Sequence, residues 1–206
     1  MKIPKVLHGI WFGSKLPKQF KKYRETWRKH HPDWKFILWT EDNLFKLENH
    51  ELFDKANTPA EQSDIARLEI LKRFGGIYAD MDFECYQNIE LLIGYHSFFI
   101  VMDKPVWKGC IPKYNIPYLN NALIGCIPDH PLINRLIHRL PGFVEENKDE
   151  HVCYRTGPGF VSQTLHKECD VLLLDNYKLR KEGYFRHHYA NSWKETEPQP
   201  RPWPKR

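Results

Sequence analysis

The sequence predicts a single α/β domain in which a mainly parallel central sheet is flanked by helices. Up to Ala79, short apolar stretches with strand propensity alternate with stretches of helical spacing, in the order strand, helix, strand, helix, helix, strand. The length of 206 residues suits one domain with a substantial core. A buried strand also runs directly into Asp80, and polar groups that follow strands gather at one edge of such sheets.

The first elements follow from local patterns. Lys5–Phe12 is predicted to form the first strand, which Gly13-Ser14 ends in a turn. Pro17–His31 is predicted to be a helix. Its apolar stripe consists of Phe20, Tyr23 and Trp27. Lys35–Thr40 is the second strand, and Glu41-Asp42-Asn43 opens a further helical segment.

The central stretch has a clear helix start and a clear helix end. Thr58 can cap the free N–H groups, Pro59 suits the first helical position, and Glu61 completes a capping box. Gly75-Gly76 allows a left-handed turn at the end of the helix. Ile77–Ala79 is short, apolar and compatible with a strand, so we expect a buried strand that leads into two aspartates.

Four charged residues surround this strand. If the extended geometry continues, strand alternation points Asp80 and Asp82 the same way, where two carboxylates suit a hard divalent cation that also holds a diphosphate. Asp64 and Arg67 are three residues apart, hence on one helix face, where they could bind hydroxyls and phosphate or sugar oxygens. The alternatives are loop carboxylates for the first pair and a solvated ion pair for the second.

The pattern loosens after Glu84. Phe98–Met102 is expected to be a strand, and residues 103–119, with three prolines, an irregular loop on the acceptor side. A further strand is expected at Leu123–Ile127. Helices are expected at Pro131–Leu140 and at Phe160–Lys167, the second after a Gly-Pro turn.

The ends of the chain and the cysteines bear on domain organisation and location. We expect one domain over residues 1–194 and a proline-rich, basic tail or linker over 195–206, from which the natural chain could continue. Met1–Lys5 is not followed by the apolar region of a signal peptide, and no run is apolar for the roughly 18 residues that span a bilayer.

The number of cysteines is odd, and no two of them have the spacing of a metal site, which favours reduced thiols and a cytoplasmic location. The five cysteines are Cys85, Cys110, Cys126, Cys153 and Cys169.

The positive charge is local. The formal net charge is +5, and Lys15–Lys35 holds eight Lys or Arg residues against Glu25 and Asp33. This region is either an ordinary solvated surface helix or a peripheral contact with an anionic membrane. No groove pattern of arginines and aromatics and no zinc-finger spacing favours nucleic acid.

Two blocks of the central stretch resemble a known family. Residues 63–67, Ser-Asp-Ile-Ala-Arg, and residues 75–82, Gly-Gly-Ile-Tyr-Ala-Asp-Met-Asp, resemble the DXD-containing sugar-binding region of glycosyltransferases. This family includes the yeast initiating α-1,6-mannosyltransferase and bacterial capsular sugar transferases, and the large clostridial glucosylating toxins share the elements. The resemblance implies a GT-A (Rossmann-like) fold, a nucleotide-sugar donor, Mn²⁺ or Mg²⁺, and retention of anomeric configuration. Yeast relatives carry a membrane anchor, which this chain does not show.

The resemblance also assigns site residues. Residues 3–11 resemble the family's opening block. In the toxin relatives the corresponding tryptophan stacks on the nucleotide base, and the resemblance implies this role for Trp11; the alternative is a core tryptophan. Asn121 resembles an asparagine that contacts the donor sugar, with a turn asparagine as the alternative. The catalytic candidates are Asp64, Arg67, Asp82 and Asn121. The donor-binding candidates are Trp11, Asp64, Arg67, Tyr78, Asp80, Met81, Asp82, Asn121, Ser192 and Trp193.

A last cluster resembles the family's ending of two histidines, an aromatic residue, Ser and Trp. A neutral imidazole from His187 or His188 could complete the metal coordination that Asp80 and Asp82 begin; the resemblance does not decide between the two histidines. Ser192-Trp193 could close over the diphosphate as a lid. A solvated loop is the alternative.

The expected activity is metal-dependent transfer of a sugar, from a UDP-sugar rather than a GDP-sugar, to a glycan, lipid-linked or protein-linked acceptor hydroxyl. With retention, the leaving phosphate can help to deprotonate the acceptor; with inversion a carboxylate base is needed, which the sequence does not identify. One alternative is a haloacid-dehalogenase-like phosphatase with Asp80 as nucleophile and Asp82 as acid/base, but residue 84 is Glu where Thr or Val is wanted. The other is a non-catalytic sugar- or nucleotide-binding module.

Overall fold

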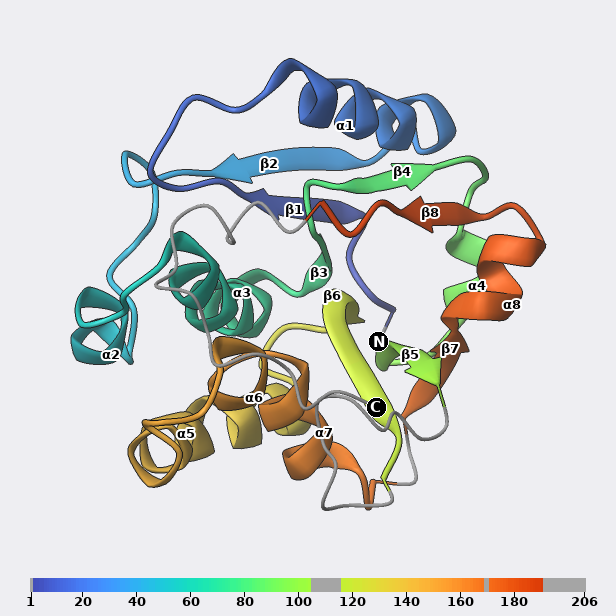
Figure 1. Ribbon diagram of the computed structural model, residues 1–206. Coiled ribbons are helices and arrows are strands. Elements are labelled where there is room, and N and C mark those ends of the chain that lie inside the picture. The colour runs from blue at the N-terminus through green and yellow to red at the C-terminus, as the bar shows by residue number, and fades with distance from the viewer. Residues whose placement is uncertain (1, 105–115, 169–170, 191–206) are drawn as a thin grey trace, which may run out of the picture.

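A six-stranded sheet with the order β2-β1-β3-β6-β5-β7 forms the centre of the molecule (Figure 1). The structure is a computed structural model and describes residues 2–104, 116–168 and 171–190. The strands are β1 (Val6–Ile10), β2 (Lys35–Trp39), β3 (Gly76–Ala79), β5 (Phe98–Lys104), β6 (Tyr118–Cys126) and β7 (Leu172–Asp175). Only β6 among them runs antiparallel to its neighbours. The predicted α/β fold with a mainly parallel sheet is confirmed.

Helices and a small second sheet cover the two faces of this sheet (Figure 1). One face packs against α3 (Pro59–Phe74), α5 (Pro131–Glu146) and α7 (Pro158–Leu165), with α2 (His50–Asp54) beside α3 and α6 (Val152–Arg155) beside α7. The other face packs against α1 (Lys18–His30), α4 (Glu90–Ile93), α8 (Asn176–Lys181) and the antiparallel pair β4 (Phe83–Cys85) and β8 (Phe185–His187). None of the helices in the described ranges has the length and apolar character needed to cross a bilayer.

The central stretch forms as its local signals predict. The Thr58 hydroxyl accepts a hydrogen bond from the Glu61 N–H at 3.2 Å, and Pro59 is the first residue of α3. The helix ends at Gly75, whose φ of 59° lies in the left-handed region. A Cβ atom at Gly75 would also lie 2.6 Å from Pro128, so close packing favours glycine there as well. All four residues of β3 are buried.

Several elements differ from the expected bounds. Glu41-Asp42-Asn43 form a turn and do not open a helix, because the next helix, α2, begins only at His50. The extended geometry does not continue to Asp82: β3 ends at Ala79, and a turn follows in which the Phe83 N–H bonds to the Asp80 carbonyl at 3.1 Å. Strand β6 begins at Tyr118 instead of Leu123, because it pairs with both β3 and β5. Helix α5 passes through Pro141 and ends at Glu146, since its apolar stripe continues to the buried Phe143.

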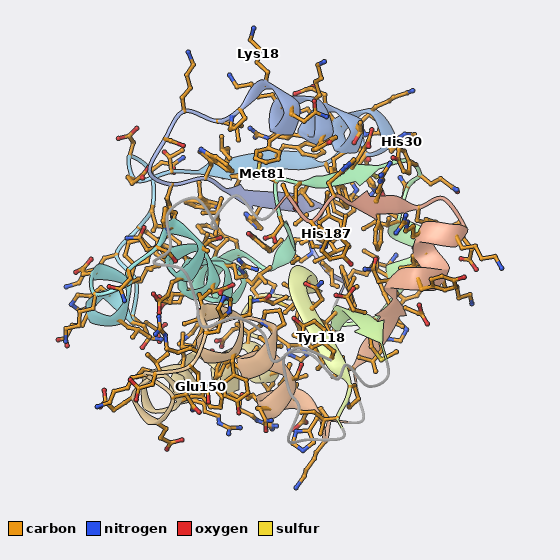
Figure 2. All side chains as sticks on the ribbon, in the orientation of Figure 1. Lys18, His30, Met81, Tyr118, Glu150 and His187 are labelled. Atoms are coloured by element: carbon orange, nitrogen blue, oxygen red, sulfur yellow. The ribbon has the colours of Figure 1, made fainter. Side chains whose placement is uncertain are left out.

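Helix α1 has the predicted amphipathic form. Tyr23 and Trp27 are buried, whereas the basic residues lie mainly on the outer face, where Lys18 points away from the sheet (Figure 2). Within Lys18–His30, six Lys or Arg residues face one Glu, a balance of +5 that equals the net charge of the whole chain. This arrangement fits both alternatives for the basic region.

His8 on β1 is a fully buried histidine with both ring nitrogens in hydrogen bonds. The Trp39 indole donates to Nδ1 at 3.1 Å, so the other nitrogen, Nε2, carries the hydrogen and donates it to the Gly75 carbonyl at 2.9 Å. The neutral ring therefore makes both hydrogen bonds, one as donor and one as acceptor. Burial lowers the pKa of His8 to about 4, although the Gly75 carbonyl opposes this shift.

Acid should therefore destabilise the fold through His8. Between about pH 7 and about pH 4.5, we expect this residue alone to reduce the free energy of unfolding by about 2–3 kcal/mol, since the unfolded chain takes up the proton near pH 6.5 and the folded protein only near pH 4. Urea unfolding at both pH values measures this loss. The His8→Asn variant should show a smaller difference between the two pH values, and an equal difference in both proteins would contradict the prediction.

Candidate functional site

The candidate site lies where the carboxyl ends of β1, β3 and β5 meet the start of β6. Because β6 runs in the opposite direction, Asn120 and Asn121 near its start reach the edge at which β3 ends. Asp80 and Asp82 follow β3, and β8 brings His187 to the same place through its pairing with β4. Figure 2 shows Met81 and His187 in this central region between α1 and β6.

Asp80, Asp82 and His187 form a group with the composition of a metal site. One ligand atom from each of the three lies within 4.8 Å of the others. The Asp80 carboxylate accepts a hydrogen bond from the Tyr78 hydroxyl at 2.6 Å and lies 3.5 Å from Arg67. Burial and the neighbouring Asp82 charge raise the pKa of Asp80, against the effect of Arg67.

Asp82 is held from three sides by the C-terminal segment. Its Oδ1 lies 3.3 Å from His187 Nε2, its Oδ2 accepts the Ala190 N–H at 2.8 Å, and its carbonyl accepts the His188 N–H at 3.1 Å. Burial pushes the pKa of Asp82 up and that of His187 down. Their mutual hydrogen bond and charge outweigh burial, so the pKa of Asp82 is lowered and that of His187 is raised.

The structure separates the two histidines. The His187 ring lies between Phe83, at 4.4 Å, and Tyr189, at 3.9 Å between ring centroids, and its buried Nδ1 has no hydrogen-bond partner within the described residues. His188 points elsewhere: its Nε2 lies 2.9 Å from Glu84, and its ring stacks on Tyr23 at 4.2 Å. Adjacent strand residues face opposite sides, so only one of the pair can reach Asp80 and Asp82.

Arg67 is a buried cation at the centre of the acidic residues. Its Nη2 lies 2.9 Å from Asp64, its Nη1 donates to the Asn121 carbonyl at 2.9 Å, and its guanidinium lies 4.4 Å from the Tyr78 ring centroid. Burial would lower its pKa, but Tyr78, Asp64 and Asp80 raise it, so Arg67 stays charged. Asp64 and Arg67 thus share one helix face as predicted, and their ion pair is buried and not the solvated pair of the alternative interpretation.

Asp64 is occupied by protein partners. Oδ1 accepts the Asn121 amide at 2.9 Å and contacts Arg67, while Oδ2 accepts the Thr156 hydroxyl at 2.8 Å. Burial raises its pKa, which Arg67 and the two hydrogen bonds oppose. Thr156 is a site residue for which the sequence suggested no role. A Cβ atom at Gly157 would lie 3.3 Å from Asp64 Oδ2, so this glycine lets the loop approach.

Trp11 directly follows β1, and the Met81 side chain packs beside Gly9 of the same strand. Trp11 is half-buried against Phe20, at 5.2 Å, and its buried indole N–H has no partner among the described residues. It borders a cavity of about 360 Å³, lined by Trp11, Ser14, Leu16, Lys21, Arg24, Glu25, Leu38 and Thr40. A Cβ atom on Gly9 would lie 2.5 Å from the Met81 sulfur, so only glycine leaves room for this side chain. Ser192 and Trp193 lie outside the described residues.

A further polar cluster beside the site was not predicted. The Asp103 carboxylate, at the end of β5, accepts hydrogen bonds from Asn120 at 2.7 Å and from Asn176, and lies 3.4 Å from the Tyr189 hydroxyl. The signal that singled out Asp80, a carboxylate directly after an expected strand, also applies to Asp103.

Comparison with known proteins shows which proteins this chain resembles. Residues 17–99 match the family described as glycosyltransferase sugar-binding region containing DXD motif. The resemblance to DXD-containing glycosyltransferases is confirmed. The matched segment contains Asp64, Arg67, Asp80 and Asp82, whereas Asn121 and His187 lie outside it.

Two curated relatives extend the similarity along the chain. An inositol phosphoceramide mannosyltransferase of Schizosaccharomyces pombe is 28% identical over 95% of this chain and 64% of its own length. An uncharacterized glycosyltransferase of Acanthamoeba polyphaga mimivirus is 33% identical over 75% of this chain and 61% of its own length. The chain thus spans less than two thirds of the length of these relatives.

Solved structures show the fold. The PaToxG glycosyltransferase matches with a TM-score of 0.61 and 18% identity, over 81% of this chain and 70% of its own. The UDP-bound glycosyltransferase domain of the YGT toxin matches with a TM-score of 0.57 and 12% identity, over 89% and 79%. The predicted GT-A fold is confirmed.

Proposed function

We propose that this protein is a metal-dependent glycosyltransferase that moves a sugar from a nucleotide-sugar donor to an acceptor hydroxyl. The observation that carries the proposal is the convergence of Asp80, Asp82 and His187 beside the buried Arg67–Asp64 pair. The matched sugar-binding region and the relatives named as mannosyltransferases support it. A phosphatase or a plain binding module would not need this combination of donor-site groups.

The three ligand groups fit a divalent cation. Two carboxylates suit Mn²⁺ and Mg²⁺, and an imidazole favours Mn²⁺ of the two, since Mg²⁺ prefers oxygen ligands and its own waters. A metal bound there would neutralise charge on the departing nucleoside diphosphate. The protein's own contribution is orientation: Tyr78 donates to Asp80, and the Ala190 N–H donates to Asp82, so both carboxylates are held in place.

Arg67, Asp64 and Asn121 form the proposed donor-sugar end of the site. Arg67 offsets the charge of Asp64 and Asp80, and it ties α3 to β6 through the Asn121 carbonyl. Because both Asp64 oxygens have protein partners, we infer that Asp64 mainly holds Asn121 and Arg67 toward the sugar. We assign Ser192 and Trp193 to the diphosphate on sequence resemblance alone, and retention on the same ground.

A donor panel tests the proposal. UDP- and GDP-linked hexoses, mannose included, would be incubated with Mn²⁺ or Mg²⁺, with an inositol phosphoceramide-type lipid and simple glycans as acceptors, and nucleotide release would be measured. We expect metal-dependent release from one nucleotide class, preferentially UDP, and faster release with the right acceptor. Phosphate release from small phosphomonoesters, without nucleotide release from any sugar donor, would contradict the proposal.

Trp11 should contribute to nucleotide binding. The indole N–H, which has no partner among the described residues, and the adjoining cavity suit a nucleotide base, and loss of base stacking typically costs about 1–3 kcal/mol. Trp11→Ala should therefore weaken UDP affinity by roughly 5- to 150-fold in calorimetric titration. Phe20→Ala is the control, because it removes the ring packed against Trp11 and leaves the indole in place. Unchanged affinity in a folded Trp11 variant would assign this residue to the core.

A further inference from the structure

Tyr189 connects the C-terminal segment to the edge of the central sheet. Its ring packs on His187, with the ring centroids 3.9 Å apart. Its hydroxyl accepts a hydrogen bond from the Asn176 amide at 2.9 Å and lies within 3.4 Å of Asp103 Oδ1, to which it can donate. One side chain thus contacts both a ligand candidate and the polar cluster at the ends of β5 and β7.

The two residues that contact the Tyr189 hydroxyl, Asp103 and Asn176, belong to a larger hydrogen-bond network. Asp103 accepts the Asn120 amide at 2.7 Å through Oδ2 and the Asn176 amide through Oδ1. The Asn120 side-chain oxygen in turn accepts the Ala122 N–H at 2.9 Å. These bonds join β5, β6 and the first residue of α8, so the Tyr189 hydroxyl meets groups held by three elements of the fold.

The backbone at Tyr189 supports the same role. Its φ of 49° lies in the left-handed region, which residues other than glycine rarely adopt and which persists only where surrounding contacts impose it. The residues on either side both donate to Asp82, His188 to the carbonyl at 3.1 Å and Ala190 to Oδ2 at 2.8 Å. The unusual conformation therefore lies between two bonds that hold Asp82.

Bulk packing does not account for this tyrosine. The residue is 48% exposed, so it buries less apolar surface than a core aromatic, and its contacts include the site histidine and the polar side chains of Asn176 and Asp103. A residue that served only the core would not require a hydroxyl at this place.

We propose that Tyr189 is a positioning residue, anchored by Asp103 and Asn176, that holds His187 and the Ala190 N–H against Asp82 and so prepares the metal site. This inference rests on the proposed function, because it takes Asp82 and His187 as metal ligands. Supporting groups of this kind typically change metal affinity by about 10- to 100-fold when removed.

The test uses the Tyr189→Phe variant, which removes the hydroxyl and keeps the ring. We expect Mn²⁺ affinity, measured by calorimetry in the absence of donor, to fall by about 3- to 10-fold, as for the loss of a single hydrogen bond, with little change in melting temperature. The Ala190 amide should exchange with solvent faster by a similar factor in the metal-free protein. Tyr177→Phe on α8, next to Asn176, is the matched control, since Tyr177 is 73% exposed, and it should change neither quantity.

Asn176→Ala removes the partner and should have the same two effects. The double variant should lose less than the sum of the single losses, because both changes break one interaction. Unchanged Mn²⁺ affinity and Ala190 exchange in both single variants would overturn the inference. His187→Ala separates the two proposals: if this variant binds Mn²⁺ like the parent, the proposed metal site is wrong, while Ala190 exchange in Tyr189→Phe still decides the positioning role.

Discussion

Asp82→Ala should abolish sugar transfer, and Asp80→Ala should reduce it by roughly a hundredfold or more. Removal of groups that only support metal ligands already costs about 10- to 100-fold, and these carboxylates are the ligand candidates themselves. Asp82 should have the larger effect because it also holds His187 and the Ala190 N–H. Mn²⁺ calorimetry beside a transfer assay measures both losses.

The fold should survive both substitutions. Asp80 is half-buried, and burial raises the pKa of its carboxyl, so removing this carboxylate removes an unfavourable charge from the folded state. Glu84→Ala is the matched control: this carboxylate lies two residues from Asp82 and contacts the other histidine, His188, at 2.9 Å. We expect it to keep Mn²⁺ binding. Parent-like transfer by both aspartate variants in metal-depleted buffer would refute the metal site.

Arg67→Ala should destabilise the protein by about 3–5 kcal/mol and eliminate transfer. The substitution leaves Asp64 without its cation in a buried position, and breaking a buried pair in this way is among the costliest changes known. Arg67→Lys should recover part of the stability but little activity, because an ammonium cannot contact Asp64, Ser63 and Asn121 together. Urea unfolding at pH 7 measures the loss.

The stability deficit of Arg67→Ala should become smaller at acidic pH. Without Arg67, the pKa values of Asp64 and Asp80 should rise further in the folded state, so the variant should regain part of its deficit relative to the parent as the pH falls through those raised values. Arg28→Ala is the control: Arg28 pairs with Glu25 at the same spacing, but on the exposed face of α1, where such pairs contribute about 0–1 kcal/mol. An equally small loss in Arg67→Ala would contradict the structural role of this residue.

Local sequence patterns alone predict the helix, the glycine stop and the buried strand that carry Asp64, Arg67 and Asp80. These features depend on capping, glycine conformation and helical spacing, which act within a few residues. The same local rules were insufficient immediately beyond Ala79. The chain turns there, so Asp82 approaches Asp80 through a Phe83–Asp80 backbone bond and not through strand alternation.

The distant residues that complete the site are selected by contacts between segments far apart in the chain. Asp82 and Ala190 are 108 residues apart, and the pairing of β4 with β8 brings them together. That pairing also turns His187 toward the carboxylates and His188 toward Glu84, a choice that two adjacent identical residues cannot reveal. The reversed direction of β6 likewise delivers Asn121 to Arg67. Strand pairing and strand direction depend on packing across the whole sheet, so no local pattern could have specified these contacts.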